Sequence, residues 1–192
     1  MTYFCVSLFE IDLVKLVVGL GNPGRRYAKT RHNIGFRVAD RVVKLLVPSG
    51  AKWQLDKRVS STYITCPLKG REVVVAKPIS FMNQSGIPLK ALAERFKLLP
   101  QDIIVIHDDK DIILGKFKTQ INRGAAGHNG VKSIISSLET QEFHRLRIGV
   151  ASDNRNNMED TVKFVLGRFG FLERGLVKTV INSAAEQIID LI

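Results

Sequence analysis

The amino-acid sequence predicts an α/β fold: a single domain built on a mixed, mostly parallel, twisted β-sheet with helices on both faces. Two observations support this prediction. Short β-branched runs alternate with amphipathic helical patterns along the chain, an order typical of parallel sheets. The 192 residues also fit one domain, and a composition of 45% apolar and 24% charged residues is that of a globular protein.

The first half of the chain supplies a strand, a helix, a hairpin and a second helix. Residues 13–20 form a β-branched run that ends near a glycine, and residues 36–47 repeat apolar side chains at helical spacing. Two runs at 61–66 and 71–77, joined by a short turn with proline and glycine, predict a β-hairpin. The amphipathic pattern over 87–99 predicts a helix that ends before a proline.

The second half again alternates strands and helices. Residues 102–107 predict a buried strand, residues 115–122 alternate like an edge strand, and residues 127–138 form a helical pattern that opens between glycines. A strand over 143–151 and an amphipathic helix over 171–191 complete the series. In sheets of this kind the functional site lies beyond the carboxyl ends of the strands.

Residues 1–12 are interpreted as an extension ahead of the first strand. The stretch lacks a basic start and carries two acidic residues, so it is a poor signal peptide and is too short to span a bilayer. Cys5 and Cys66 lie far apart without a C-x-x-C motif, which predicts neither a disulfide framework nor a zinc site. We therefore predict a cytosolic protein with one domain over residues 13–192.

The net charge is strongly positive. Lys and Arg number 29 against 18 Asp and Glu, which gives a formal charge of +11. A polyanion is a natural partner for such a surface, but a basic surface kept for solubility has the same composition. Composition alone leaves both interpretations open.

Residues 15–36 (KLVVGLGNPGRRYAKTRHNIGF) raise the question of a nucleotide-binding loop, because Gly19, Gly21 and Gly24 match the spelling G-x-G-x-x-G. A dinucleotide loop needs a helix that begins on the glycines and an acidic residue about 20 positions later, at the end of a second strand. Here a proline and a polar stretch separate the glycines from the predicted helix, and the nearest acid, Asp40, lies inside that helix. The dinucleotide interpretation is therefore disfavoured.

The same segment is instead predicted to be a long loop at the carboxyl end of a buried strand, a common place for functional side chains. An amide, a histidine and several guanidinium groups could fix a carbonyl, accept a proton and hold phosphate. The alternative is purely structural, with a turn at Asn22 and a helix cap at His32. The polar side chains of the loop are Asn22, Arg25, Arg26, Tyr27, Arg31, His32 and Asn33.

An acidic run follows the buried strand, where a carboxylate could orient a histidine base from another loop. Asp108, Asp109 and Asp111 could alternatively bind magnesium or form only a polar turn. The orienting role is preferred, because no phosphate-binding glycine-lysine loop accompanies the acids. Of the other histidines, His128 could simply begin a helix, and His144 is expected to be structural.

Water is the predicted nucleophile if the protein is an enzyme. The chain has no G-x-S-x-G motif, and neither cysteine has a histidine nearby in sequence. Water attack on an activated carbonyl needs a neutral histidine as base, a carboxylate that fixes its tautomer, and donors aimed at the developing oxyanion. The residues that could fill these roles are His32, Asp108, Asn22, Asn83 and Asn129.

Five blocks resemble the bacterial-type peptidyl-tRNA hydrolase family in order and spacing. They are VVGLGNPGRRYAKTRHNIGF, KPISFMNQSG, VIHDD, AGHNGVKSII and FHRLRIGV, and the similarity runs from about Leu13 to the last helix. The resemblance implies an enzyme that cleaves the ester between a peptide and the terminal ribose of tRNA, freeing tRNA from stalled or abortive translation. It implies peptidyl-tRNA as the partner, no membrane, and neither a metal nor an organic cofactor.

The resemblance also implies roles for individual residues. His32 would activate water and Asp108 would orient His32. Asn22 and Asn83 would bind the peptide and polarise the ester carbonyl, and Asn129 would help hold the substrate and the water. The residues expected around the peptide and the terminal adenosine are Tyr27, Phe81 and Met82.

Two departures from the family pattern lie on the tRNA side. Ala125 and Ala126 stand in a loop that is usually rich in glycine, which predicts a stiffer loop. Gln120 stands where a basic residue is common, and ASDNRNN replaces a glycine-proline segment after the strand over 143–151. The residues then expected to meet tRNA phosphate are Lys118, Arg123, Arg147 and Arg155.

Two functions from different classes remain open at this point. The leading hypothesis is an esterase for peptidyl-tRNA. The rival is an RNA-binding protein that keeps the scaffold without hydrolysis, like a chloroplast intron-splicing relative of the family. Retention of His32 and Asp108 favours the enzyme, and a monomer is predicted because one moderate core needs no partner.

Overall fold

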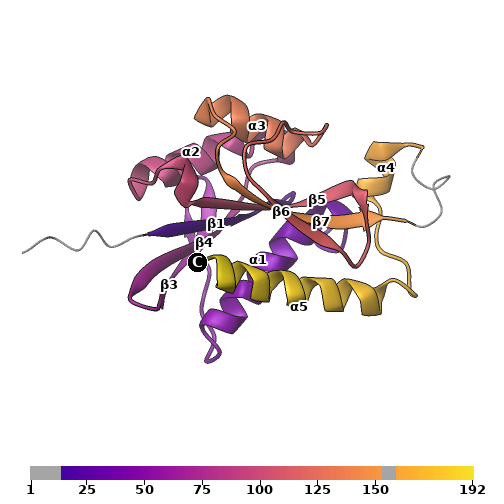
Figure 1. Ribbon diagram of the computed structural model, residues 1–192, viewed down its shortest axis with the longest axis horizontal. Coiled ribbons are helices and arrows are strands. Elements are labelled where there is room, and N and C mark those ends of the chain that lie inside the picture. Colours follow the sequence, from indigo (N-terminus) through magenta and orange to yellow (C-terminus); the bar gives the residue numbers. More distant parts are fainter. Residues whose placement is uncertain (1–13, 153–158) are drawn as a thin grey trace, which may run out of the picture.

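Seven strands form one sheet in the order β2-β3-β4-β1-β5-β7-β6 in the computed structural model, which describes residues 14–152 and 159–192 (Figure 1). The central strands β4, β1, β5 and β7 are parallel to one another, and β2, β3 and β6 pair antiparallel at the two edges. The predicted mixed, mostly parallel sheet is therefore confirmed. The strands are β1 (Lys15–Gly19), β2 (Gln54–Asp56), β3 (Ser61–Leu68), β4 (Arg71–Pro78), β5 (Ile103–Ile113), β6 (Phe117–Gln120) and β7 (His144–Ala151).

Helices cover both faces of the sheet, as predicted. Helices α1 and α5 lie on one face and α2 and α3 on the other, while the short α4 lies beside the ends of β5 and β7 (Figure 1). The helices are α1 (Ile34–Leu46), α2 (Gly86–Arg95), α3 (Asn129–Leu138), α4 (Thr161–Leu166) and α5 (Arg174–Leu191). Single turns of 3-10 helix occur at Arg31–Asn33, Met82–Gln84 and Pro100–Asp102.

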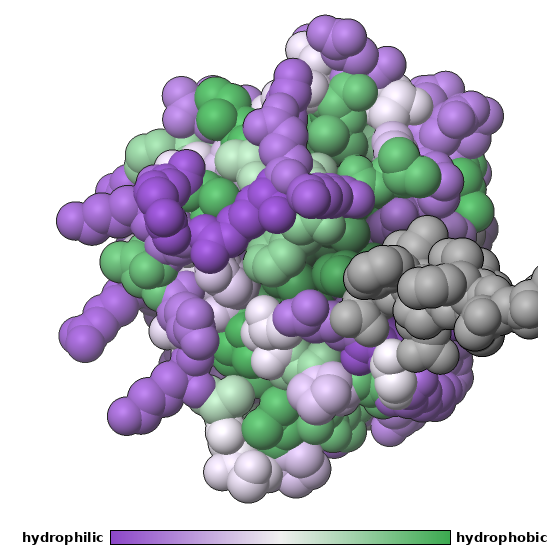
Figure 2. All heavy atoms as spheres, turned by 90° about the vertical axis from the view of Figure 1, so that its left-hand side faces the viewer, coloured by the Kyte–Doolittle hydropathy of each residue, from purple (hydrophilic) through white to green (hydrophobic). Residues whose placement is uncertain are grey.

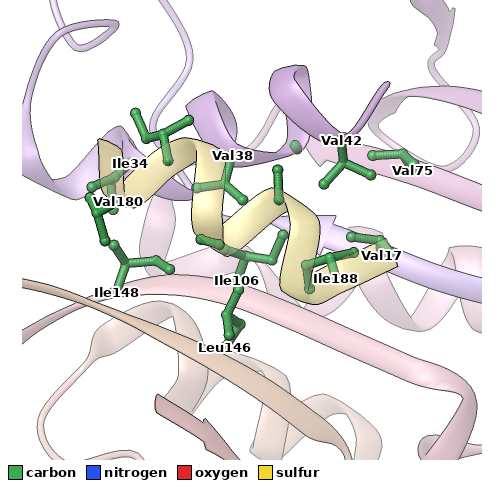
Figure 3. Packing of buried hydrophobic residues seen from close by; sticks show 14 of the residues in the cluster. Val17, Ile34, Val38, Val42, Val75, Ile106, Leu146, Ile148, Val180 and Ile188 are labelled. Carbon is green, nitrogen blue, oxygen red and sulfur yellow. The ribbon is translucent and has the colours of Figure 1, made fainter. Parts of the chain in front are cut away.

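An aliphatic layer fastens α1 and α5 to the sheet. Ile34 and Val38 of α1, Ile106 of β5, and Val180 and Ile188 of α5 belong to one buried cluster (Figure 3). Burying a side chain of this kind contributes roughly 1.5–3 kcal/mol. The layer therefore fixes the start of α1, which directly follows the 3-10 turn that carries His32.

The glycines of the first loop serve close packing and turning. A Cβ on Gly19 would lie 2.4 Å from the carbonyl oxygen of Gly35, and a Cβ on Gly35 would lie 2.4 Å from that of Ile106. Both positions therefore exclude any side chain, because α1 begins directly against the backbone of β1 and β5. Gly24 has φ +100°, a left-handed conformation that glycine adopts without strain. These contacts explain the G-x-G-x-x-G spelling without a nucleotide.

The strand predicted over 102–107 is longer than expected. β5 continues to Ile113, with an irregular pairing to β7 between Asp109 and Ile113. A carboxylate is normally excluded from a sheet interior, but here imidazole groups donate hydrogen bonds to Asp108 and a guanidinium group pairs with Asp109. The short β2 and α4 were not predicted, because elements of three and six residues carry no clear periodic signal.

The predicted extension over 1–12 and the phosphate candidate Arg155 lie outside the described residues. Among the helices that the structure describes, none is both long and apolar enough to cross a bilayer.

Candidate active site

A cleft of about 450 Å³ collects residues from segments that are distant in sequence. The loop after β1 contributes Asn22 and His32, the turn after β4 contributes residues 81–83, β5 contributes Asp108, and the first turn of α3 contributes Asn129. Helix α4 forms a further, mainly apolar wall. The cleft therefore lies at the carboxyl ends of parallel strands, where the fold predicts a site.

His32 and Asp108 meet in this cleft. Nδ1 of His32 lies 2.8 Å from Oδ1 of Asp108. Because an ionised carboxylate only accepts hydrogen bonds, Nδ1 carries a proton and donates it to Asp108. Nε2 of the neutral ring is then the basic nitrogen, and the His32 side chain, 12% exposed, lines the cleft.

His128 is a second histidine on the same carboxylate oxygen. Its Nε2 lies 3.0 Å from Oδ1 of Asp108, and its Nδ1 accepts the backbone N–H of Val131 at 3.2 Å. A ring nitrogen that accepts a hydrogen bond carries no proton, so the proton of His128 is on Nε2 and is donated to Asp108. His128 thus caps α3 and also holds the aspartate. The sequence predicted the helix start but not the bond to Asp108.

Asp108 is kept ionised by its surroundings. Burial alone would raise the pKa of this carboxyl, but the electrostatic interaction with the rings of His32 and His128 and the N–H groups they donate lower it well below its ordinary value. An anionic carboxylate at this position fixes the tautomer of His32. It would also stabilise the imidazolium that forms when His32 accepts a proton.

His107 packs behind this cluster. Its Nδ1 donates to the backbone carbonyl of Asp108 at 2.7 Å, and its Nε2 is buried without a hydrogen-bond partner among the described residues. Burial, followed by the electrostatic interaction with His128, lowers the pKa of His107 to about 3, so the ring is neutral at ordinary pH. His107 therefore supports the aspartate segment from inside the sheet.

Asn22 is oriented by two sets of hydrogen bonds. Its backbone N–H donates to Oδ1 of Asn33 and its carbonyl accepts from Nδ2 of Asn33, each at 2.9 Å. Its side-chain Oδ1 accepts the backbone N–H of Met82 at 2.8 Å. The Nδ2 amide group is therefore the end of Asn22 that is left as a donor in the cleft. Asn33 was one of the polar loop residues in the sequence, but its positioning role was not predicted.

The other predicted substrate residues are distributed around the cleft. Asn83, in the 3-10 turn after Phe81, and Asn129, in the first turn of α3, are exposed and line it. Phe81 is 51% exposed and Met82 is buried, and both also line the cleft. Tyr27 lies instead in the loop after β1, with the guanidinium of Arg26 4.5 Å from its ring centroid, and is not part of the cleft lining that the structure describes.

The three carboxylates of the acidic run do not converge. Asp108 faces the two imidazoles, Asp109 accepts the Nε–H of Arg147 at 2.7 Å, and Asp111 pairs with Lys110 at the surface. The geometry does not support the magnesium alternative.

One group of side chains within residues 14–152 and 159–192 is close enough together to share an ion: His32, Asp108 and His128. The ring nitrogens that face Asp108 are both N–H donors, so an ion there would have to displace two protons.

The basic residues predicted to meet phosphate lie in different settings. Lys118 in β6 and Arg123 in the following loop are exposed. Arg147 lies in a different setting: its side chain is only 9% exposed, and its guanidinium group is bonded to Asp109 and to Oε1 of Gln120, each at 2.7 Å. The carboxylate of Asp109 draws it into the sheet.

Fold and site together define the class of the protein: a single α/β domain whose cleft holds a histidine–aspartate pair beside carboxamide groups. Comparison with known proteins gives the family. A family model described as peptidyl-tRNA hydrolase matches residues 16–192, and the chain belongs to the peptidyl-tRNA hydrolase family.

Individual relatives agree with this assignment. The peptidyl-tRNA hydrolase of Aquifex aeolicus is 44% identical over 171 residues, which cover 89% of this chain and 86% of that protein. The peptidyl-tRNA hydrolase of Mycolicibacterium smegmatis is 43% identical, with coverage of 89% and 87%. A crystal structure of peptidyl-tRNA hydrolase from Acinetobacter baumannii superposes with a TM-score of 0.82 at 29% identity, over 92% of this chain and 87% of that one.

Proposed function

We propose that this chain hydrolyses the ester bond between a peptide and the terminal ribose of tRNA. The observation that carries the proposal is the hydrogen bond of 2.8 Å between His32 and Asp108. It fixes the proton on Nδ1 and leaves Nε2 as a base in a cleft that carboxamide groups also line. Membership of the family supports the choice of peptidyl-tRNA as substrate.

The reaction follows from the positions of the polar atoms. Nε2 of His32 takes a proton from water as the water oxygen attacks the carbonyl carbon of the ester, and Asp108 stabilises the resulting imidazolium. Nδ2 of Asn22 donates to the oxyanion of the tetrahedral intermediate. The bond from the carbonyl carbon to the ribose oxygen then breaks, and the imidazolium returns its proton to that oxygen. The products are tRNA with a free hydroxyl group and a peptide carboxylic acid, which releases its proton to water and becomes a carboxylate.

Substrate contacts are assigned by position. Asn83 and Asn129 would bind the peptide backbone across the cleft, and Phe81 and Met82 would contact its apolar groups. Tyr27 would act at the rim, against the terminal adenosine. Exposed Lys118 and Arg123 would meet tRNA phosphates, where each neutralised phosphate releases counterions and strengthens binding.

His32→Ala tests the mechanism. Loss of a general base lowers the rate by about 10²–10⁴-fold, so we expect kcat to fall by this factor while the unfolding temperature and tRNA binding stay close to those of the parent protein. The measurement is release of N-blocked amino acid from N-blocked aminoacyl-tRNA. His144→Ala, a histidine in β7 outside the cleft, is the matched control and should retain activity. Full activity of His32→Ala would refute the mechanism.

The rival function, RNA binding without hydrolysis, is not favoured by family membership. The same turnover assay on the parent protein separates the two, because binding of N-blocked aminoacyl-tRNA without product would support the rival. The monomeric state, the cytosolic location and the domain boundary at residue 13 remain part of the proposal.

A further inference from the structure

Arg31, the residue before His32, is buried against two aromatic rings. Its guanidinium carbon lies 4.6 Å from the ring centroids of both Phe164 and Phe169, and its Nη2 donates to both carboxylate oxygens of Glu173 at 3.0 Å. Arg31 is only 7% exposed. Cation–π contacts and a charge-assisted pair are strongest when desolvated in this way.

The backbone around Arg31 is tied to the same segment. The N–H of Arg31 donates to the carbonyl of Gly167 at 3.0 Å, and Thr30 forms an isolated β-bridge with Arg168. Glu173 also accepts the N–H of Gly170. Residues 164–173, from the end of α4 to the start of α5, are therefore folded around this one side chain.

That segment continues into a wall of the active site. Helix α4 presents Val162, Val165 and Leu166 to the cleft, opposite the polar groups that surround His32. A helix of six residues is too short to be stable by itself, since most helical stability in proteins comes from packing. The position of the apolar wall therefore depends on the contacts that Phe164 makes with Arg31.

We propose that Arg31 is a positioning residue that keeps the apolar wall formed by α4 in a fixed position relative to His32. Its backbone sets the entry to the 3-10 turn that carries the base, and its side chain holds the segment that carries the wall. The inference rests on the proposed hydrolysis and adds a determinant of substrate binding to it.

Lysine could not replace arginine here. A planar, weakly hydrated guanidinium group can lie over aromatic rings while it donates to both oxygens of a carboxylate, whereas an ammonium group is a compact, strongly hydrated charge. Arg31→Lys therefore keeps the charge and removes the geometry. Glu173→Gln keeps the shape of the acceptor and removes its charge, and so provides a second, milder variant.

The test measures kcat and KM with N-blocked aminoacyl-tRNA well below the unfolding temperature. We expect kcat/KM to fall about 10-fold or more in Arg31→Lys, because misplacement of a binding group by 1 Å can reduce rate by about 100-fold. Glu173→Gln should change it in the same direction and by less. The matched control is Arg95→Lys: this arginine also lies over two rings, Tyr63 and Phe96, and pairs with Asp56, away from the cleft. It should retain the parent kcat/KM.

A double-mutant cycle separates positioning from stability alone. Leu166→Ala shortens a side chain of the α4 wall, and its effect on kcat/KM should be at least threefold smaller in the Arg31→Lys background than in the parent. The inference would be overturned if the effects of Arg31→Lys and Leu166→Ala on kcat/KM simply multiplied in the double variant. It would also be overturned if Leu166→Ala alone had the kcat/KM of the parent protein. Parent kcat/KM in both Arg31→Lys and Glu173→Gln would overturn it as well. An inactive parent protein would instead refute the proposed function.

Discussion

Asp108 Oδ1 accepts two imidazole N–H groups, from His32 at 2.8 Å and from His128 at 3.0 Å. The first bond leaves a basic nitrogen in the cleft, and the second ties the carboxylate to the N-terminus of α3. Rotation of the carboxylate would break both hydrogen bonds. In the proposed mechanism the orientation of the base therefore depends on His128, a residue that does not itself transfer a proton.

His128→Asn tests this dependence. Asparagine is a good N-cap, so its side-chain oxygen can still accept the N–H of Val131, but the shorter side chain does not reach Asp108. We expect kcat to fall about tenfold, because a hydrogen bond to a charged group contributes about 1.5–3 kcal/mol. Steady-state kinetics and a urea unfolding curve give the two readouts.

His128→Ala is the comparison, since it removes the cap as well as the bond. It should lose a further ~1 kcal/mol of unfolding free energy with little more loss of kcat. Unchanged kcat in His128→Asn would contradict the role assigned to the second histidine.

The residues of the site differed in how far the sequence could predict them. His32, Asp108 and Asn22 were predicted because each stands in a motif with a chemical reason for its residue type. The bond from His128 to Asp108 was not, because it depends on which ring nitrogen caps α3 and on β5 continuing past His107. The contacts of Arg147 were not predicted, since nothing in a strand pattern shows that Asp109 and Gln120 face it.

The first turn of α1 lies directly against β1 and β5, and it thereby fixes the position of the preceding 3-10 turn that carries His32. Gly35→Ala tests this contact. The added Cβ would lie 2.4–2.6 Å from backbone atoms of Ile106 and Leu20, which cannot yield as a flexible side chain would. We expect the unfolding free energy to fall by about 3 kcal/mol, the upper part of the range for overpacking, and kcat to fall as His32 moves.

Gly175→Ala in α5 is the matched control. No atom lies within 4 Å of the Cβ it would acquire, so alanine should stabilise this helix by about 0.5–1 kcal/mol. Chemical denaturation of both variants measures the contrast. Equal effects of the two substitutions would mean that the start of α1 can shift away from the sheet without loss.

Elements with strong patterns were predicted well, and those that depend on tertiary contacts were not. The helix expected over 36–47 is α1, and the hairpin expected over 61–77 is β3 and β4. Helix α4 has no clear pattern of its own, and it forms because Phe164 packs under Arg31 and the remaining apolar side chains face the cleft. Such an element can be recognised only when its partners are known.

The molecule as a whole combines a broad positive charge with one polar cleft. On the face shown in Figure 2, long hydrophilic side chains project from the surface between smaller apolar patches. A formal charge of +11 attracts any polyanion, so it accounts for capture of RNA but not for the reaction. In the proposed mechanism the chemistry on the ester comes from His32 and the carboxamide groups of the cleft.

The unfolding free energy of the whole fold should decrease at acid pH because of His107, which lies within the sheet. Its pKa is about 3 in the folded protein, against an ordinary value of 6.5. Between these values the unfolded chain binds a proton that the folded chain does not, so stability is lost as pH falls below 6.5. The slope approaches about 1.4 kcal/mol per pH unit. The pKa of Asp108 is also lowered, but from 3.8, so its stabilising effect is lost only at lower pH.

His107→Phe removes this titration while keeping an aromatic ring of similar size. At pH 7 the unfolding free energy of the variant should be roughly 1 kcal/mol lower than that of the parent, because the hydrogen bond to the Asp108 carbonyl is removed. The variant should then regain stability relative to the parent as pH falls from 6 to 4.5, by about 1.4 kcal/mol per unit. Urea unfolding at four pH values in this range measures the difference. If the unfolding free energies of the two proteins changed in parallel with pH, His107 would be protonated or solvated in the folded protein. The surroundings of His107 would then be more open to water than its burial indicates.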